Sequence, residues 1–192
     1  MERLERLIFV RHGETEGQSS IRYYGATDIA LSDLGREQIR RARDRIAAER
    51  FDVVFASSLA RATESARILA PDHAIELVPE FREVHFGRWE GLTREEIALR
   101  DPELFPVWQS QLTRFDYPEG ERRADFHARI ARGLERVRTS GAASVLVVAH
   151  KGVLRTLLEL VSGETLPAAE PELGGVIRVV RDGGGRWRRG DA

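Results

Sequence analysis

The chain has 192 residues, of which 42% are hydrophobic, so it is long enough for one domain with a full core. The formal net charge is −1 although 32% of the residues are charged, so no overall basic field favours nucleic acid or an anionic membrane as a partner. Cysteine is absent, which excludes disulfides and thiolate metal sites. The acidic first residues and the lack of a long apolar run predict neither a signal peptide nor a membrane span, and we expect a cytoplasmic protein.

The first part of the chain predicts two strands separated by an amphipathic helix. Residues 4–10 are apolar enough for a buried strand. Ser32 is placed to cap the following helix, because its hydroxyl can accept a free amide of the first turn. The stripe of this helix that we expect to be buried contains Leu34, Ile39, Ala42 and Ile46. Residues 53–56 predict the second strand, and Ser57 or Ser58 is expected to cap the next helix, which runs to about residue 70.

The middle of the chain predicts one more strand and then mainly helix. Residues 75–78 are the third strand candidate. Thr93 and Glu96 fit a capping box, in which each side chain binds the backbone amide of the other residue. Between residues 93 and 117 we expect short helices broken by Pro102 and Pro106, followed by a longer helix from about 122 to 139.

The last part of the chain contains the strongest strand signal, at residues 144–149. An apolar helix is predicted over 152–161, ending near Gly163, and a strand over 176–180 leads into a hairpin turn at 182–185. Apolar strands separated by helices imply a mostly parallel sheet that is covered on both faces. The expected fold class is therefore α/β, with three αβα layers.

Polar residues gather where the predicted strands end. Arg11 and His12 follow the first strand, and Arg61 lies shortly after the second. Glu83 follows the third strand, and His150 directly follows the strand at 144–149. In a parallel sheet these segments reach the same edge, and ligands of open α/β sheets bind outside that edge. Two strand-end histidines from distant parts of the chain suggest an anion site in which one imidazole is a nucleophile.

Taken together, these segments resemble the histidine phosphatase superfamily, also called the phosphoglycerate mutase-like family. The resemblance covers nearly the whole chain, and the matching segments occur in the family's order. They are Arg11-His12-Gly13-Glu14-Thr15, residues 25–35, residues 57–66, Phe81-Arg82-Glu83 with residues 87–91, and residues 148–155. The resemblance implies a phosphoglycerate mutase-like fold for a single domain over 1–192. Residues from about 88 to 140 would form a small helical cover over its pocket.

The resemblance also implies a catalytic role for each matched residue. His12 would attack phosphorus and form a phosphohistidine, while Glu83 would protonate the leaving alkoxide and then deprotonate the attacking water. Arg11 and Arg61 can each offer a forked pair of donors to phosphate oxygens, and their charges should favour the neutral form of His12. His150 would hydrogen-bond the transferring oxygens. This set can supply the positive charge that phosphoryl transfer needs, so we expect no metal and no cofactor.

Other positions are assigned to substrate binding, and some depart from the family pattern. Gln18 stands where the family often has Asn, and Lys151 stands where the family often has Gly. Lys151 either reaches a second anionic group of the substrate or points to solvent. Tyr24, in the loop that borders the pocket in this family, either stacks on a substrate ring or packs the loop, and Gly25 lies beside it. Glu119 replaces the first Gly of the family's Pro-Gly-Gly-Glu element.

The expected activity is hydrolysis of a small phosphorylated metabolite. A short cover leaves the pocket open to water, which favours a metal-independent phosphomonoester phosphatase over a mutase. Two alternatives stay open: phosphoglycerate mutase-type phosphoryl transfer, and a weakly active domain that binds a phosphorylated ligand in regulation. Nothing in the sequence selects the phosphomonoester. We expect a monomer or a homodimer, with no nucleic-acid or membrane partner.

Overall fold

One six-stranded sheet forms the centre of the computed structural model, in which residues 4–111 and 114–190 are described. The strand order is β3-β2-β4-β1-β5-β6. The strands are β1 (Arg6–Arg11), β2 (Val53–Ser57), β3 (Ile75–Val78), β4 (Ser144–Ala149), β5 (Val176–Arg181) and β6 (Trp187–Arg189). Strands β1, β2, β3 and β4 are mutually parallel, whereas β5 runs antiparallel to β1, and β6 runs antiparallel to β5. The predicted mostly parallel α/β sheet is confirmed.

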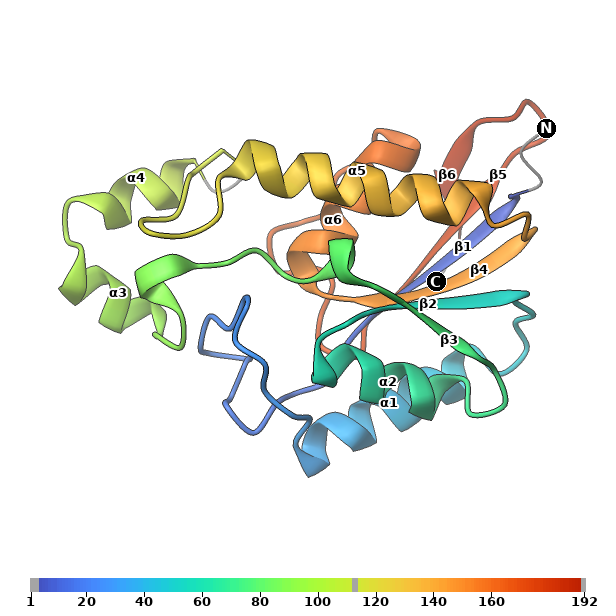
Figure 1. Ribbon diagram of the computed structural model, residues 1–192, viewed down its shortest axis with the longest axis horizontal. Helices are drawn as coiled ribbons and strands as arrows, with labels where there is room; N and C mark the ends of the chain where they lie inside the picture. Colours follow the sequence, from blue (N-terminus) through green and yellow to red (C-terminus); the bar gives the residue numbers. More distant parts are fainter. Residues whose placement is uncertain (1–3, 112–113, 191–192) are drawn as a thin grey trace.

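Helices cover both faces of this sheet (Figure 1). The α-helices are α1 (Asp33–Arg45), α2 (Ala60–Leu69), α3 (Arg94–Arg100), α4 (Leu104–Ser110), α5 (Arg123–Thr139) and α6 (Lys151–Ser162). Two 3-10 helices, η1 (Pro79–Phe81) and η2 (Gly87–Trp89), lie between β3 and α3. Helices α1 and α2 lie on one face, and α5 and α6 lie on the other. The three predicted layers follow from this arrangement.

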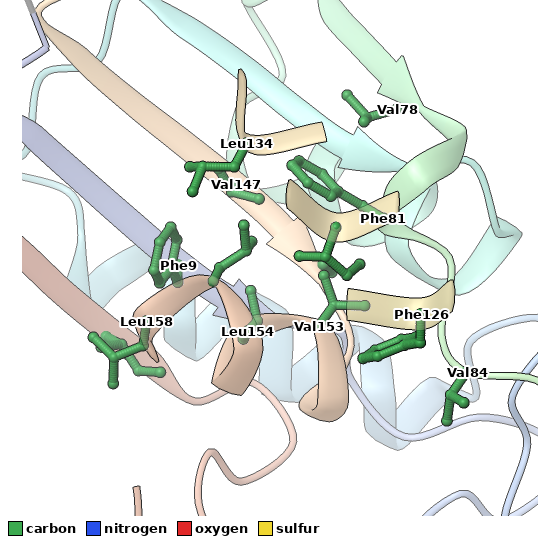
Figure 2. Close-up of a cluster of buried hydrophobic side chains, with 14 of the residues drawn as sticks. Phe9, Val78, Phe81, Val84, Phe126, Leu134, Val147, Val153, Leu154 and Leu158 are labelled. Atoms are coloured by element: carbon green, nitrogen blue, oxygen red, sulfur yellow. The ribbon is translucent and has the colours of Figure 1, made fainter. Parts of the chain in front are cut away.

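Side-chain alternation along the strands explains how one sheet carries two cores. In β1, Ile8 and Val10 pack with α1 and α2, whereas Phe9 packs with α5 and α6. Figure 2 shows the core on the α5 and α6 side of the sheet, where Phe9 and Val147 face side chains of these helices such as Leu134 and Leu158. All these side chains are almost fully excluded from solvent. The central strands are therefore held from both sides, and their carboxyl ends are fixed in space.

Helices α3 and α4 lie beyond one end of the sheet rather than on either face (Figure 1). An aromatic cluster anchors this part of the chain: Trp89 stacks on Phe115 with 5.3 Å between ring centroids, and Trp108 and Tyr117 pack edge-on against Trp89. Within the range 88–140 that we expected to cover the pocket, α5 packs largely on the sheet, and Arg123 and His127 of this helix line the cleft. The capping box of Thr93 with Glu96 is present at the start of α3.

Three local predictions are wrong, each for a physical reason. Leu34 lies in the first turn of α1 and is 60% exposed, because the buried stripe of this helix runs through Gly35, Ile39 and Ala42 and Leu34 lies one position away from it. Pro106 does not break a helix but lies in the first turn of α4, where the missing amide would have had no partner in the helix. Neither Ser57 nor Ser58 caps α2: Leu59 occupies the N-cap position without a side-chain cap. The cap of α1 by Ser32 is confirmed.

Candidate active site

The register of the central strands brings the two strand-end histidines together. Arg11 pairs with Ala149 across the parallel β1–β4 ladder, so His12 and His150 leave the sheet side by side. Their ring centroids are 5.0 Å apart. Arg61 enters from the first turn of α2, and Glu83 follows η1 and binds the backbone of α6. The structure therefore gathers Arg11, His12, Arg61, Glu83 and His150 at the carboxyl edge of the sheet.

The imidazole of His12 is held in one tautomer. Its Nδ1 lies 2.7 Å from the carbonyl oxygen of Gly13, which can only accept, so Nδ1 carries the proton and Nε2 keeps its lone pair. Burial, followed by the positive charges of Arg61 and Arg11, holds the pKa of His12 well below its usual range. The residue as a whole is 4% exposed. A neutral imidazole with a free Nε2 is the form that a nucleophile requires.

Arg61 is fully buried and is held by a loop of backbone carbonyls. Its two terminal nitrogens donate to the carbonyl oxygens of Thr27 at 2.9 Å, Gly25 at 2.8 Å and Tyr24 at 3.2 Å. Among the described residues, its Nε has no partner. Gly25 is needed here because a Cβ would lie 1.8 Å from the carbonyl oxygen of Val84.

Arg11 is also held by the backbone, because it donates to the carbonyl oxygen of Pro171 at 2.9 Å. Its Nε is a second buried donor without a partner in the described part of the chain. Burial is the main reason that the pKa of Arg11 falls to about 10, so the guanidinium still carries its charge at neutral pH. Two buried guanidiniums with spare donors can bind the oxygens of an anion.

His150 occupies the N-cap position of α6 and hydrogen-bonds with the hydroxyl of Ser57 through Nε2 at 2.8 Å. Its Nδ1 is buried without a partner in the described chain. Burial and the charge of Arg61 hold the pKa of His150 well below its usual range. Ser57 thus orients His150 instead of capping α2. The signal in the sequence for this role of Ser57 was its position at the end of β2, the strand that lies next to β4.

The carboxylate of Glu83 is fixed by two backbone amides. Oε1 accepts from Val84 and Oε2 accepts from Gly152, both at 3.0 Å. Its backbone is fixed by Arg129 of α5, which donates to the carbonyl oxygens of Glu80, Arg82 and Glu83 and pairs with Glu121. No local pattern in the sequence indicated Arg129, because the carbonyl oxygens that it binds belong to residues 46 to 49 positions earlier in the chain.

A cleft of about 790 Å³ opens beside these residues. Its lining includes Arg11, His12, Glu83, Tyr24 and Lys151. Two residues that we assigned to substrate binding are placed elsewhere. Gln18 is exposed in a left-handed conformation with φ 62°, and Gly25 supports Arg61 without lining the cleft.

Aromatic side chains form one wall of the cleft, including Tyr23 from the loop that also carries Tyr24. Tyr23 makes edge-on contacts with Phe86 and Trp108, and Phe86 makes one with Tyr117. The loop at residues 25–27, which lies between this wall and Arg61, is held by Glu90. The carboxylate of Glu90 accepts hydrogen bonds from the amides of Gly25, Ala26 and Thr27. The site therefore has a polar floor at the sheet edge and an apolar side wall.

Within residues 4–111 and 114–190, no group of three or more His, Cys, Asp or Glu side chains is arranged to hold a metal ion. None of the helices over residues 4–111 and 114–190 combines the length and the apolar character needed to cross a membrane.

Comparison with known proteins finds a family-model match over residues 7–188, described as the histidine phosphatase superfamily (branch 1). A glucosyl-3-phosphoglycerate phosphatase of Mycolicibacterium vanbaalenii is 32% identical over 185 residues, which are 91% of this chain and 81% of that protein. A bifunctional protein of Mycobacterium tuberculosis is 37% identical over 81% of this chain, which spans 43% of that protein's length. The crystal structure of the alpha-ribazole phosphatase from Shigella flexneri superposes with a TM-score of 0.81 at 26% identity, covering 96% of this chain and 94% of that one.

Proposed function

Since the chain belongs to the histidine phosphatase superfamily (branch 1), we propose that it is a metal-independent phosphomonoester phosphatase that acts through a phosphohistidine on His12. The observation that carries the proposal is the fixed tautomer of His12, which leaves the Nε2 lone pair free, beside two guanidiniums whose buried Nε donors have no partner among the described residues. The cleft of about 790 Å³ is in the range of pockets that bind small molecules, so the proposed substrate is a small phosphorylated metabolite.

In the first half-reaction, the substrate's phosphoryl group lies between Arg11, Arg61 and His150. Nε2 of His12 attacks phosphorus; the Nε2–P bond forms as the bond from phosphorus to the ester oxygen breaks. Glu83 transfers its proton to that oxygen, so the substrate leaves as an alcohol. The guanidiniums stabilise the charge on the transferring oxygens throughout.

In the second half-reaction, water replaces the alcohol. Glu83, now a carboxylate, takes a proton from this water as its oxygen attacks phosphorus. The bond between phosphorus and Nε2 of His12 breaks, and inorganic phosphate leaves. The hydrogen bond from Nδ1 to Gly13 keeps the ring oriented through both steps. The charge of Arg11 and Arg61 supplies the electrostatic stabilisation that other phosphatases take from metal ions.

The test measures inorganic phosphate released from a panel of phosphomonoesters in the presence of EDTA. Wild type is compared with His12→Ala and with His73→Ala, since His73 is exposed and lies outside the cleft. The proposal expects chelator-resistant release by wild type and by His73→Ala, with loss in His12→Ala. Release that EDTA abolishes, release that survives in His12→Ala, or no release from any ester by folded wild type would each overturn it.

A further inference from the structure

Lys151 is the only lysine in the sequence, although the chain contains 30 lysine and arginine residues in total. It begins α6 directly after His150 and lines the cleft beside Arg11. The side chain is half-buried, and its ammonium makes no hydrogen bond or ion pair with any other described residue. Withdrawing a cation from water without a partner costs free energy, so this position is suited to an anion that arrives with a ligand.

The surroundings of Lys151 reinforce its positive charge. Arg155, one turn later in α6, lines the same cleft, and its terminal nitrogens donate to the backbone carbonyls of Leu166, Pro167 and Glu170. Arg155 therefore contributes charge while its terminal donors are occupied. Burial, and then the charges of Arg11 and Arg155, lower the pKa of Lys151. Three neighbouring cations thus lie along α6 and the end of β1.

Acidic groups also line this cleft, but among the described residues none of them forms an ion pair with Lys151. Glu83 is held by two backbone amides and is assigned to proton transfer. Glu159 lies one turn beyond Arg155, and Glu172 is exposed on the loop that follows α6. Among the described residues, neither forms an ion pair with Lys151 or Arg155. The positive region therefore extends from Arg11 to Arg155 and ends at Glu159.

We infer that Lys151 binds a second anionic group of the substrate, so that the preferred substrates are phosphomonoesters that also carry a carboxylate or another phosphate. The inference rests on the proposed function, because the phosphoryl group to be transferred occupies the end of the cleft at His12. A lysine ammonium suits this task, because its three donors rotate freely and accept either kind of anion. Arg155 adds long-range attraction without competing for the ligand's oxygens.

Two matched substrate pairs test this inference and identify the anion. 3-Phosphoglycerate carries a carboxylate where glycerol 1-phosphate carries a hydroxymethyl group. Fructose 1,6-bisphosphate and fructose 6-phosphate differ in the second phosphate. For each pair, the ratio of kcat/KM is measured in wild type, Lys151→Met and Lys151→Arg. We expect wild type to prefer the more anionic member of at least one pair, and Lys151→Met to lower that ratio about tenfold through KM. Lys151→Arg should retain most of the preference.

A second measurement needs no turnover. Because Lys151 is the only lysine, an amine-acetylating reagent can modify this side chain and the chain's α-amino group, and mass spectrometry separates the two. In His12→Ala, the preferred doubly anionic ester should protect Lys151 from acetylation, whereas its less anionic partner should not. Equal protection by both members, or ratios that Lys151→Met leaves unchanged in both pairs, would overturn the inference. Failure of wild type to hydrolyse any of the four esters would instead count against the proposed function.

Discussion

Lowering the pH tests whether His12 is neutral in the folded protein. Burial, with the charges of Arg61 and Arg11, holds its pKa well below the usual value near 6.5. At a pH between the lowered pKa of folded His12 and 6.5, the unfolded chain binds a proton on His12 and the folded chain does not. The stabilising contribution is therefore complete above pH 6.5 and is lost as the pH falls below it. Each such histidine lowers the free energy of unfolding by about 1.4 kcal/mol per pH unit.

His150 has the same shift from the same main cause, so the two contributions have the same sign. At pH 5.5, one unit below the unfolded value, the pair lowers the free energy of unfolding by about 2.8 kcal/mol relative to its plateau above pH 7.5. The assay is urea denaturation at half-unit steps from pH 5.0 to 8.0 for wild type, His12→Gln and His150→Gln. Each variant should lose about 1.4 kcal/mol of this pH dependence and run parallel to wild type above pH 7.5.

Comparing each variant with wild type cancels the contributions of the titrating groups that do not interact with the replaced histidine. A His12→Gln profile with the same slope as wild type down to pH 5.0 would refute the reasoning. It would mean that His12 takes up a proton over the same pH range in the folded and unfolded protein, so burial and the charges of Arg61 and Arg11 would not lower its pKa.

Three substitutions test other parts of the account. Glu83→Gln should lower kcat by about 10²- to 10³-fold on alkyl phosphates but much less on p-nitrophenyl phosphate, whose leaving group needs no proton; equal losses on both would contradict proton donation by Glu83. Arg129→Met should lower the free energy of unfolding by about 2–4 kcal/mol in urea denaturation, because it leaves backbone carbonyls and Glu121 without their partner. The control Arg138→Met removes only an i,i+3 pair with Glu135 and should change this free energy by no more than about 0.5 kcal/mol. Glu119 has a left-handed backbone (φ 59°), which costs a residue with a Cβ about 1 kcal/mol, so Glu119→Gly should raise the thermal midpoint. Glu119→Ala keeps the Cβ and should not raise it.

The sheet edge could be predicted because its logic is local. Each of the strands β1, β2 and β4 contains an uninterrupted apolar run of at least four residues, and a polar residue follows that run at once. Parallel strands end on the same side, so His12 and His150 had to meet whatever the detail of the connecting helices. The capping residues Ser32 and Thr93 were equally accessible, because a cap and its amide lie three residues apart.

What the sequence could not supply are contacts between distant residues. Ser57 ends a strand and precedes a helix, which is the local pattern of a cap, yet its hydroxyl hydrogen-bonds with a histidine 93 residues later. Arg129 is one of many arginines on amphipathic helices, and only the packing of α5 on η1 gives it the backbone of Glu83. Lys151 was ambiguous for the same reason, because whether its surroundings are solvent or a cleft depends on the 165–173 segment.

The measurement that tests the central claim most directly is rapid-quench trapping of the phosphoenzyme. Wild type is mixed with a ³²P-labelled ester that it hydrolyses, quenched in alkali within the first turnover, and digested for mass spectrometry. The account predicts an alkali-stable, acid-labile phosphoryl group on the peptide that contains His12, formed before phosphate is released. Phosphate release without any labelled peptide, or a label on a residue other than His12, would contradict it.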